Sequence, residues 1–268
     1  MGLNIIVCMK LVPDPEGPSD SFTVDTAGSR VVVRGLPPVA NPYDENALEA
    51  AIRIKESQGE GDPARIILLC MGKSLSRAVV LKAIATGADE AVLIEGEQLD
   101  AQALDSHATA TLLSAAIRRL DWDLVLTGRQ ASDTNSGQVG AGIAQLLGIP
   151  AITVARRVEV VGGTVQVERV LPDGYEVIQA PLPALVTVSH ESGDLRYPAL
   201  AAIKAAKHLP QKALSLADLG SGLLPSGLVE RVALAAPSHE RRCAMVTAET
   251  PAEIGRELAA RLRADRVL

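Results

Sequence analysis

The residues best suited to chemistry lie in one stretch, Asp123–Gly148, where a polar loop separates two apolar segments. Within the loop, Gly128–Gly137, Arg129 and Gln130 could supply a charge and an amide to the phosphate or base of a nucleotide. The loop follows Leu124–Thr127, an apolar run of strand length. Ligands of open α/β sheets bind where such loops leave the carboxyl ends of strands. This position and composition suit a nucleotide-binding loop.

The segment after the loop is predicted to be a helix that starts close to the loop. Its apolar residues recur at helical spacing, and Gly148 followed by Pro150 predicts its end. Asn135 and Ser136 are good N-cap residues. A helix N-terminus offers free backbone N–H groups and a partial positive charge to an anion. The start of this helix is therefore a candidate phosphate site.

Three glycines, Gly137, Gly140 and Gly142, stand at the start of this helix. Without Cβ atoms they would let a phosphate approach the backbone, and each lowers helix stability by up to about 1 kcal/mol relative to alanine. Their order, G-x-x-G-x-G, matches neither the dinucleotide motif G-x-G-x-x-G nor the G-K-[ST] of a P-loop. On spacing alone, a nucleotide loop and a polar connection with close helix–sheet packing are equally good interpretations.

The remaining reactive side chains form no catalytic or metal-binding pattern. The four histidines are scattered without metal-ligand spacing, so no metal site is expected, and no G-x-S-x-G elbow is present. Cys8 and Cys70 fall within predicted strands, where thiols typically pack in the core. Asp14 and Glu16 stand in a proline-rich loop, where we expect them to be solvated. The sequence predicts binding without catalytic residues.

Composition narrows the class of protein. The 268 residues suit one large domain or a domain with an appendage, and 47% hydrophobic residues with only 2% aromatics predict an aliphatic core. A net charge of −6, scattered basic residues and few aromatics argue against nucleic-acid binding. Three cysteines without paired spacing, and no apparent signal peptide, predict reduced thiols and a cytoplasmic protein. No apolar run suggests a transmembrane segment.

Strands and helices alternate up to Gly148, which predicts a mostly parallel sheet covered by helices. The predicted strands are Asn4–Met9, Ala64–Met71, Glu90–Ile94 and Leu124–Thr127. The predicted helices run from Pro42, with Asn41 as N-cap, to about Ser57, then over Ser74–Thr86, Leu104–Leu120 and the segment after the polar loop. A hairpin is predicted within Ser21–Arg34.

After Pro150 the pattern changes to short strands separated by turn residues. The predicted strands, which would extend the sheet as hairpins, are Ala151–Val161, Thr164–Leu171, Tyr175–Gln179 and Ala184–Ser189. A helix is predicted over Pro198–Lys207. The loop-rich stretch His208–Arg242 contains one predicted strand, Val229–Leu234, and an amphipathic helix is predicted over Pro251–Leu268.

Several short motifs, in this order and spacing, resemble the β subunits of electron transfer flavoproteins over nearly the whole chain. They are Val7-Cys8-Met9-Lys10, Asn41-Pro42-Tyr43-Asp44, Met71-Gly72, Thr86-Gly87-Ala88-Asp89, Gly128-Arg129-Gln130-Ala131, Gln138-Val139-Gly140, Val167-Glu168-Arg169, Leu182-Pro183-Ala184-Leu185-Val186-Thr187 and Arg196-Tyr197-Pro198-Ala199-Leu200. The resemblance implies a Rossmann-like α/β fold and a heterodimer with an α subunit that holds FAD. It also implies AMP, or a second FAD in bifurcating members, in the β subunit itself.

The resemblance also implies positions for the binding residues. Those expected to contact the nucleotide are Cys8, Asn41, Pro42, Tyr43, Asp44, Met71, Gly128, Arg129, Gln130, Asp133, Thr134, Asn135, Ser136, Gly137, Gln138 and Val139. The segment Ser189–Lys207 is similar to the loop that docks on flavin-dependent dehydrogenases such as acyl-CoA dehydrogenases, with Arg196, Tyr197 and an anchoring Leu200. We therefore expect a nucleotide-binding domain over residues 1–190, and a recognition loop, arm and C-terminal helix on the partner over 191–268.

Two departures from the family pattern bear on partner choice. Val170 and Pro172 stand where an acidic residue is expected. Asn135 and Ser136 replace Asp and Thr of the bifurcating loop, which keeps hydrogen-bonding capacity but removes a charge, so AMP and FAD both remain open. An alternative interpretation is an adenine-nucleotide-binding α/β protein with a structural or regulatory role.

Overall fold

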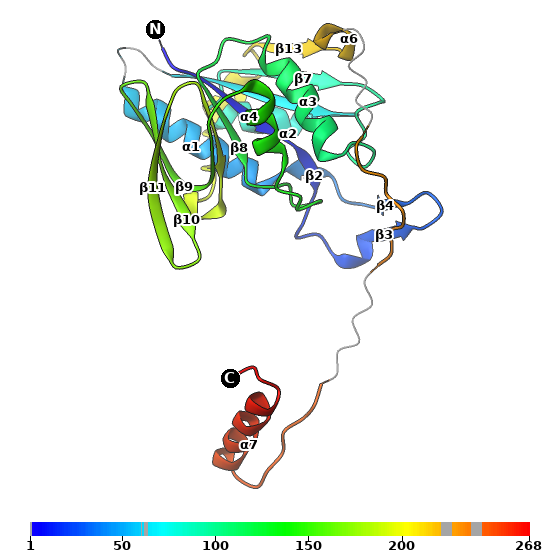
Figure 1. Cartoon of the computed structure of the whole chain (residues 1–268). Coiled ribbons are helices and arrows are strands. Elements are labelled where there is room, and N and C mark those ends of the chain that lie inside the picture. Colours follow the sequence, from blue (N-terminus) through cyan, green and yellow to red (C-terminus); the bar gives the residue numbers. More distant parts are fainter. Residues whose placement is uncertain (1, 60, 62–63, 221–226, 237–242) are drawn as a thin grey trace. The chain divides into compact units, whose positions relative to one another are not determined.

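The computed structural model describes residues 2–59, 61, 64–220, 227–236 and 243–268. The chain divides into two compact units, Met1–Ala233 and Leu234–Leu268 (Figure 1). The first unit contains the central sheet and the helices on both of its faces. The second contains one helix, α7 (Pro251–Ala264), whose N-cap Thr250 forms a capping box with Glu253.

A nine-stranded, mostly parallel sheet forms the centre of the first unit, as predicted. Its spatial order is β11-β10-β9-β12-β8-β1-β6-β7-β13. The strands are β1 (Asn4–Met9), β6 (Arg65–Gly72), β7 (Glu90–Glu95), β8 (Leu124–Gly128), β9 (Ala151–Val161), β10 (Thr164–Leu171), β11 (Gly174–Pro181), β12 (Ala184–Val188) and β13 (Gln211–Leu214). Strand β10 runs antiparallel to both of its neighbours, β9 and β11, and β10 and β11 extend one edge of the sheet as a hairpin.

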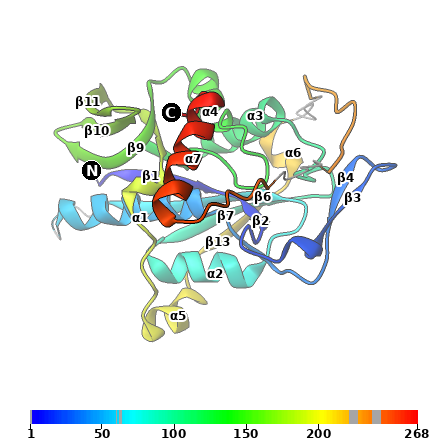
Figure 2. The ribbon, with the colours of Figure 1, turned by 90° about the horizontal axis from the view of Figure 1, so that it is seen from below.

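Strand β1 lies in the middle of the sheet and is buried on both faces. Ile5 and Val7 point into one core cluster and Ile6 into the other, and each is fully buried. Such a strand needs apolar residues without alternation, because helices cover both faces of a parallel sheet. Figure 2 shows the helices on the two faces of the sheet.

Helices α1 (Pro42–Gln58) and α2 (Arg77–Thr86) pack on one face of the sheet. Helices α3 (Ser106–Ile117) and α4 (Val139–Leu147) pack on the other. The short helices α5 (Leu200–Ala206) and α6 (Leu216–Leu219) follow β12 and β13. The strand order reverses at β1, because β6 and β7 lie on one side of it and β8 on the other. Open α/β sheets bind ligands at such a reversal.

The other described elements differ from the predictions in places. The predicted hairpin is present as β3 (Phe22–Asp25) and β4 (Arg30–Val33), and a small sheet of β2 (Leu11–Pro13) and β5 (Pro38–Ala40) was not predicted. Helices α2 and α3 begin later than predicted, at Arg77 and Ser106. Asp105 fixes the second of these starts by accepting a hydrogen bond from the Ala108 N–H.

The predicted strand Val229–Leu234 is wrong, since the described residues 227–236 form no strand. The strand in this part of the chain is instead β13, which pairs with β7 through only four residues after Pro210 and is too short to show a period. Residues 221–226 and 237–242 of the predicted loop-rich stretch, including His239, lie outside the described residues. No helix in the described part of the chain is long and apolar enough to cross a membrane.

Candidate functional site

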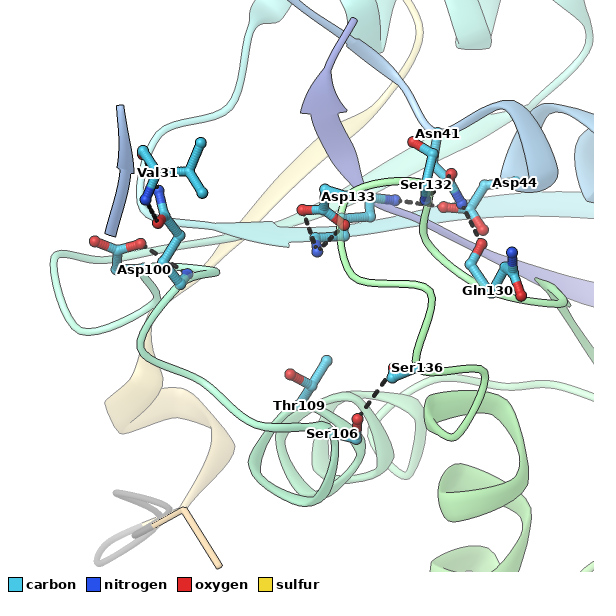
Figure 3. A network of polar contacts seen from close by, with 12 residues as sticks. Val31, Asn41, Asp44, Asp100, Ser106, Thr109, Gln130, Ser132, Asp133 and Ser136 are labelled. Carbon is cyan, nitrogen blue, oxygen red and sulfur yellow. Dashed lines mark hydrogen bonds and ion pairs between the residues drawn. The ribbon is translucent and has the colours of Figure 1, made fainter. Parts of the chain in front are cut away.

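A cavity of about 620 Å³ opens at the carboxyl ends of β1, β6 and β8, where the strand order reverses. Cys8, Met71 and Gly128 line it from the ends of these three strands. In Figure 3, Ser106 and Thr109 of α3 lie on one side, and the loop after β8 runs along the other. The central loop singled out in the sequence is therefore one wall of this cavity.

Most of the residues predicted to bind the nucleotide line this cavity. They are Cys8, Asn41, Asp44, Met71, Gly128, Arg129, Gln130, Thr134, Ser136, Gly137, Gln138 and Val139. Four do not: Pro42, Tyr43, Asp133 and Asn135. Pro42 lines a separate cavity of about 310 Å³. Asp133 pairs with Lys10 and Asn135 accepts a hydrogen bond from Gln130, while the Tyr43 ring lies 5.5 Å from the Arg129 guanidinium carbon.

Asn41 holds the loop rather than capping its own helix. It is 1% exposed and stands at the N-cap position of α1, as predicted, yet its side chain makes no capping bond there. Its Nδ2 donates to the Gln130 carbonyl at 2.9 Å, and its Oδ1 accepts from the Ser132 N–H at 3.1 Å (Figure 3). One buried amide thus fixes two backbone groups of the loop, which positions the loop before any ligand arrives.

Two further contacts hold the loop. The Lys10 ammonium pairs with the Asp133 carboxylate at 2.7 Å, and the side chains of both residues are about a quarter exposed. The Gln130 amide donates to Asn135 Oδ1 at 2.9 Å, and Asn135 adopts a left-handed φ of 51°. Asparagine tolerates this backbone conformation better than most residues. Asp133 and Asn135 therefore act on the loop itself.

Gly128 and Gly140 lie where the chain has no room for a side chain. A Cβ on Gly128 would lie 2.5 Å from Asp44 Oδ1 and 2.7 Å from the Tyr43 backbone, so no side chain fits there. A Cβ on Gly140 would meet Thr187 and Thr127 at 2.7 and 2.8 Å. Gly140 therefore brings α4 close to the sheet, which is the packing interpretation of the motif rather than the phosphate one.

Of the two remaining glycines, Gly142 serves helix packing and Gly137 serves a turn beside the cavity. A Cβ on Gly142 would meet the Ala110 Cβ at 3.0 Å, so Gly142 lets α4 pack closely against α3. Gly137 instead has φ +62° and only ordinary contacts around it, so it serves the turn before α4. Among Gly137, Gly140 and Gly142, it is therefore Gly137 whose missing side chain leaves the backbone beside the cavity uncovered.

Helix α4 starts later than the sequence suggested. Its N-cap is Gln138, and neither Asn135 nor Ser136 caps it. Among the residues that the structure describes, no side chain forms a capping hydrogen bond with this helix. The Ser136 hydroxyl instead lies 3.2 Å from the Ser106 hydroxyl of α3. The first backbone N–H groups of α4 stand beside the cavity, where a helix N-terminus favours a negative charge.

Asp44 joins α1 to two strand ends. Its carboxylate accepts hydrogen bonds from the Lys10 N–H at 2.8 Å and from the Gly128 N–H at 2.9 Å. Burial raises its pKa to about 6, although both N–H bonds favour the ionised form. Asp44 therefore holds the ends of β1 and β8 at the spacing that forms the cavity floor.

The thiols of Cys8 and Cys70 are buried, as predicted. Burial raises the pKa of both thiols far above the ordinary value, so both stay protonated and unreactive. Cys8 lines the cavity with its uncharged side chain and is 6% exposed. Within the described residues, no group of three or more His, Cys, Asp or Glu side chains is placed to hold a metal ion.

Sequence reasoning missed the wall that α3 provides. Leu104, Asp105, Ser106 and Thr109 line the cavity, as do Leu228 and Val229 from much later in the chain. The predicted helix start at Leu104 lies inside the loop, two residues before the observed start of α3 at Ser106. An available signal was Asp105, a good N-cap residue directly before Ser106, which marks a second helix start at the same edge of the sheet.

A family model described as the electron transfer flavoprotein domain matches residues 30–219, more than half of the chain. The chain belongs to the electron transfer flavoprotein family. The electron transfer flavoprotein subunit beta of Thermoanaerobacterium thermosaccharolyticum is 38% identical, over 81% of this chain and 79% of that protein. Subunit CarD of the caffeyl-CoA reductase–Etf complex of Acetobacterium woodii is 32% identical, over 99% of this chain and 100% of that protein.

Protein FixA of Bradyrhizobium diazoefficiens is also similar, at 34% identity over 94% of this chain and 89% of that protein. The resemblance to electron transfer flavoprotein β subunits, drawn from short motifs, is thus confirmed over most of the chain. Membership of this family supports a role in electron transfer. The role of individual residues toward a ligand stays a prediction.

The residues of this electron transfer flavoprotein chain that were predicted to dock a partner divide into two groups. Tyr197 is 91% exposed and Leu200, the first residue of α5, is 72% exposed, so both are available to a partner. The Arg196 guanidinium instead binds Glu49 and Glu56 of α1. Arg196 therefore fixes the segment that carries the two exposed side chains to α1.

Proposed function

We propose that this chain is the β subunit of an electron transfer flavoprotein, an electron carrier rather than a stand-alone catalyst. It pairs with an α subunit that holds FAD and carries electrons between flavin dehydrogenases, such as acyl-CoA dehydrogenases, and an acceptor. The observation that carries this proposal is the cavity at the switch point of the sheet, in a chain of this family. Free thiols at Cys8, Cys70 and Cys243 support a reducing, cytoplasmic compartment.

The chemistry of the cavity fits the adenosine phosphate part that AMP and FAD share. The uncapped start of α4 and the nearby Arg129 suit the phosphate. Met71, Leu99 and Leu104 provide an apolar wall for the base and ribose. A phosphate at one end and apolar surface at the other is the division that such a ligand requires.

When bound, a flavin supplies the redox chemistry. The residues of this chain bind and orient. The α4 N–H groups and Arg129 offset the phosphate charge, while Asn41 holds the loop and Asp44 holds the ends of β1 and β8. In this proposal the side chains of the cavity bind and orient the nucleotide and transfer no proton.

Two surfaces suit macromolecular partners in this proposal. Tyr197 and Leu200 present exposed apolar side chains on a fixed segment, which suits docking to a dehydrogenase. Helix α7 carries Ile254, Leu258 and Leu262 at helical spacing, and none of its residues, all of which are described, is buried. This amphipathic helix suits packing on the α subunit.

The test is to co-express the full chain with the α subunit of its own organism, purify the heterodimer, denature it and quantify the released nucleotides by chromatography and mass spectrometry. One FAD with one AMP per heterodimer supports a plain electron carrier. Two FAD and no AMP support a redox-active β site. A heterodimer that releases a single FAD and no other nucleotide would overturn nucleotide binding by this chain.

A variant pair assigns the nucleotide to the cavity. Arg129→Gln removes a charge at the cavity, and we expect about tenfold weaker AMP binding, as for the loss of one charge-assisted hydrogen bond. Arg157→Gln removes an exposed charge on β9, outside the residues that line the cavity, and serves as the control. AMP binding without any α subunit or flavin would favour the alternative, a nucleotide-binding protein with a structural or regulatory role.

A further inference from the structure

The segment 227–232 contributes to the cavity from a distant part of the sequence. Leu228 and Val229 line the cavity, yet they are 74% and 75% exposed. Exposed apolar side chains beside a binding cavity are covered when a ligand fills it. Two polar residues hold this segment in place, Asp105 and Arg231.

The two oxygens of the Asp105 carboxylate have separate tasks. Oδ1 accepts a hydrogen bond from the Ala108 N–H at 2.7 Å and caps α3. Oδ2 accepts from the backbone N–H groups of Leu228 and Val229, the latter at 3.0 Å. The Ala108 N–H bond, with the other two, lowers the pKa of Asp105, so it is ionised at neutral pH. One carboxylate therefore connects a helix start at the cavity to the segment.

Arg231 fixes the far end of the same segment. Its guanidinium donates to the Ser29 carbonyl at 2.7 Å and to the Gln102 carbonyl at 3.0 Å. The Gln102 side chain in turn donates to the Val31 carbonyl and accepts from the Val31 N–H. The segment is thus attached at one end to α3 and at the other to the β3–β4 hairpin.

We propose that residues 227–232 form a strap that retains the bound nucleotide, and that Asp105 and Arg231 are the residues that position it. The inference rests on the proposed function, because it concerns the same cavity. Leu228 and Val229 cover one side of the ligand, and release requires the Asp105 bonds to open. The strap therefore controls how slowly the nucleotide leaves.

Asp105→Asn separates the two tasks of this carboxylate. Asparagine is as good an N-cap as aspartate, so its Oδ1 keeps the start of α3. Its Nδ2 is a donor and cannot accept the two strap N–H groups. Arg231→Gln releases the other end of the strap without touching α3. Asp218→Asn is the matched control, because Asp218 also stands at a helix start and does not line the cavity.

The measurements use the full heterodimer with AMP and FAD as separate probes. We expect Asp105→Asn and Arg231→Gln to raise the nucleotide dissociation rate about tenfold, the effect of losing one charge-assisted hydrogen bond, and Asp218→Asn to leave it unchanged. Hydrogen exchange gives a second readout: added AMP should slow exchange at the Leu228 and Val229 amides in the wild type, and Asp105→Asn should remove that protection.

The outcomes distinguish the strap from the site. A wild-type heterodimer that binds neither probe overturns the proposed function, and the strap with it. A wild type that binds, with dissociation from both strap variants as slow as its own, overturns the strap alone. Faster exchange at the two amides together with faster release supports it.

Discussion

The guanidinium of Arg196 is bound by the carboxylate of Glu49, a residue of α1 that is 147 positions away and only 4% exposed at its side chain. Arg196 Nη2 donates to Glu49 Oε1 at 2.9 Å and Nε donates to Oε2 at 3.1 Å. Burial opposes the ionised form of Glu49, and the Arg196 bonds more than offset this, so its pKa is lowered. Arg53 and Asn46 of α1 bind carbonyls of the same segment, at Ser192 and Gly193.

Because of this ion pair, we expect Arg196 to position the segment and Leu200 to contact the partner. Arg196→Gln leaves the Glu49 charge buried with less compensation, so we expect a loss of about 2 kcal/mol in the free energy of unfolding and weaker docking to a dehydrogenase. Leu200→Ala removes an exposed side chain, so stability should change by less than about 0.5 kcal/mol, while docking falls by about 2 kcal/mol or more. Urea unfolding and a binding titration measure the two effects.

If Arg196→Gln weakens docking without any loss of stability, Arg196 contacts the partner directly, as the sequence suggested. Arg196→Lys adds a further check, because lysine keeps the charge but cannot form the two parallel bonds to Glu49. We expect it to restore only part of the stability.

Gly128 should tolerate no side chain. In Gly128→Ala the new Cβ would lie 2.5 Å from Asp44 Oδ1 and 2.7 Å from the Tyr43 backbone, so α1 and β8 must move apart. We expect a loss of about 3 kcal/mol in the free energy of unfolding, as for other overpacked sites. Gly255→Ala in α7 is the control: its Cβ meets nothing within 4 Å, so alanine there should leave stability unchanged or raise it by up to about 1 kcal/mol. Equal stability of the two variants would show that Gly128 is not confined in this way.

Asp44 should make stability depend on pH in the acidic range. Its pKa is about 6 in the folded state against an ordinary value of 3.8, so the folded state binds the proton more tightly. The resulting stabilisation is complete below pH 3.8 and is lost as pH rises through 6. Relative to Asp44→Asn, the wild type should lose about 2 kcal/mol between pH 4.5 and 7 in urea unfolding. Parallel curves for the two proteins would mean that Asp44 titrates normally.

Asn41 should matter more to the loop than to its own helix. Asn41→Ala removes both bonds to the loop, and we expect a loss of about 2 kcal/mol in stability together with weaker AMP binding. Asn41→Asp remains a good N-cap and can still accept the Ser132 N–H, but it places a carboxylate beside the Gln130 carbonyl. If helix capping were its role, Asn41→Asp would behave as the wild type in calorimetric titration with AMP.

The sequence determined the architecture because the signals for it are local. Apolar runs such as Asn4–Met9 specify buried parallel strands, and the bounds of β9 and β10 match the predictions because glycine turns separate them. The position of the loop after β8 at a strand end followed from the same alternation. Short motifs were enough to indicate the family.

The tertiary structure decided what each polar residue does, because those roles depend on partners far along the chain. Asn41 was predicted as an N-cap from its position before Pro42, but its side chain binds a loop about 90 positions away. From the sequence, Gly140 could serve either a phosphate or close helix–sheet packing, and its contacts with Thr127 and Thr187, which only the packed sheet brings near it, decide for packing. Asp105 meets Leu228 and Val229 across 123 and 124 positions. Hydrogen-bond partners and steric limits at such separations exist only once the strands are assembled, and no local pattern encodes them.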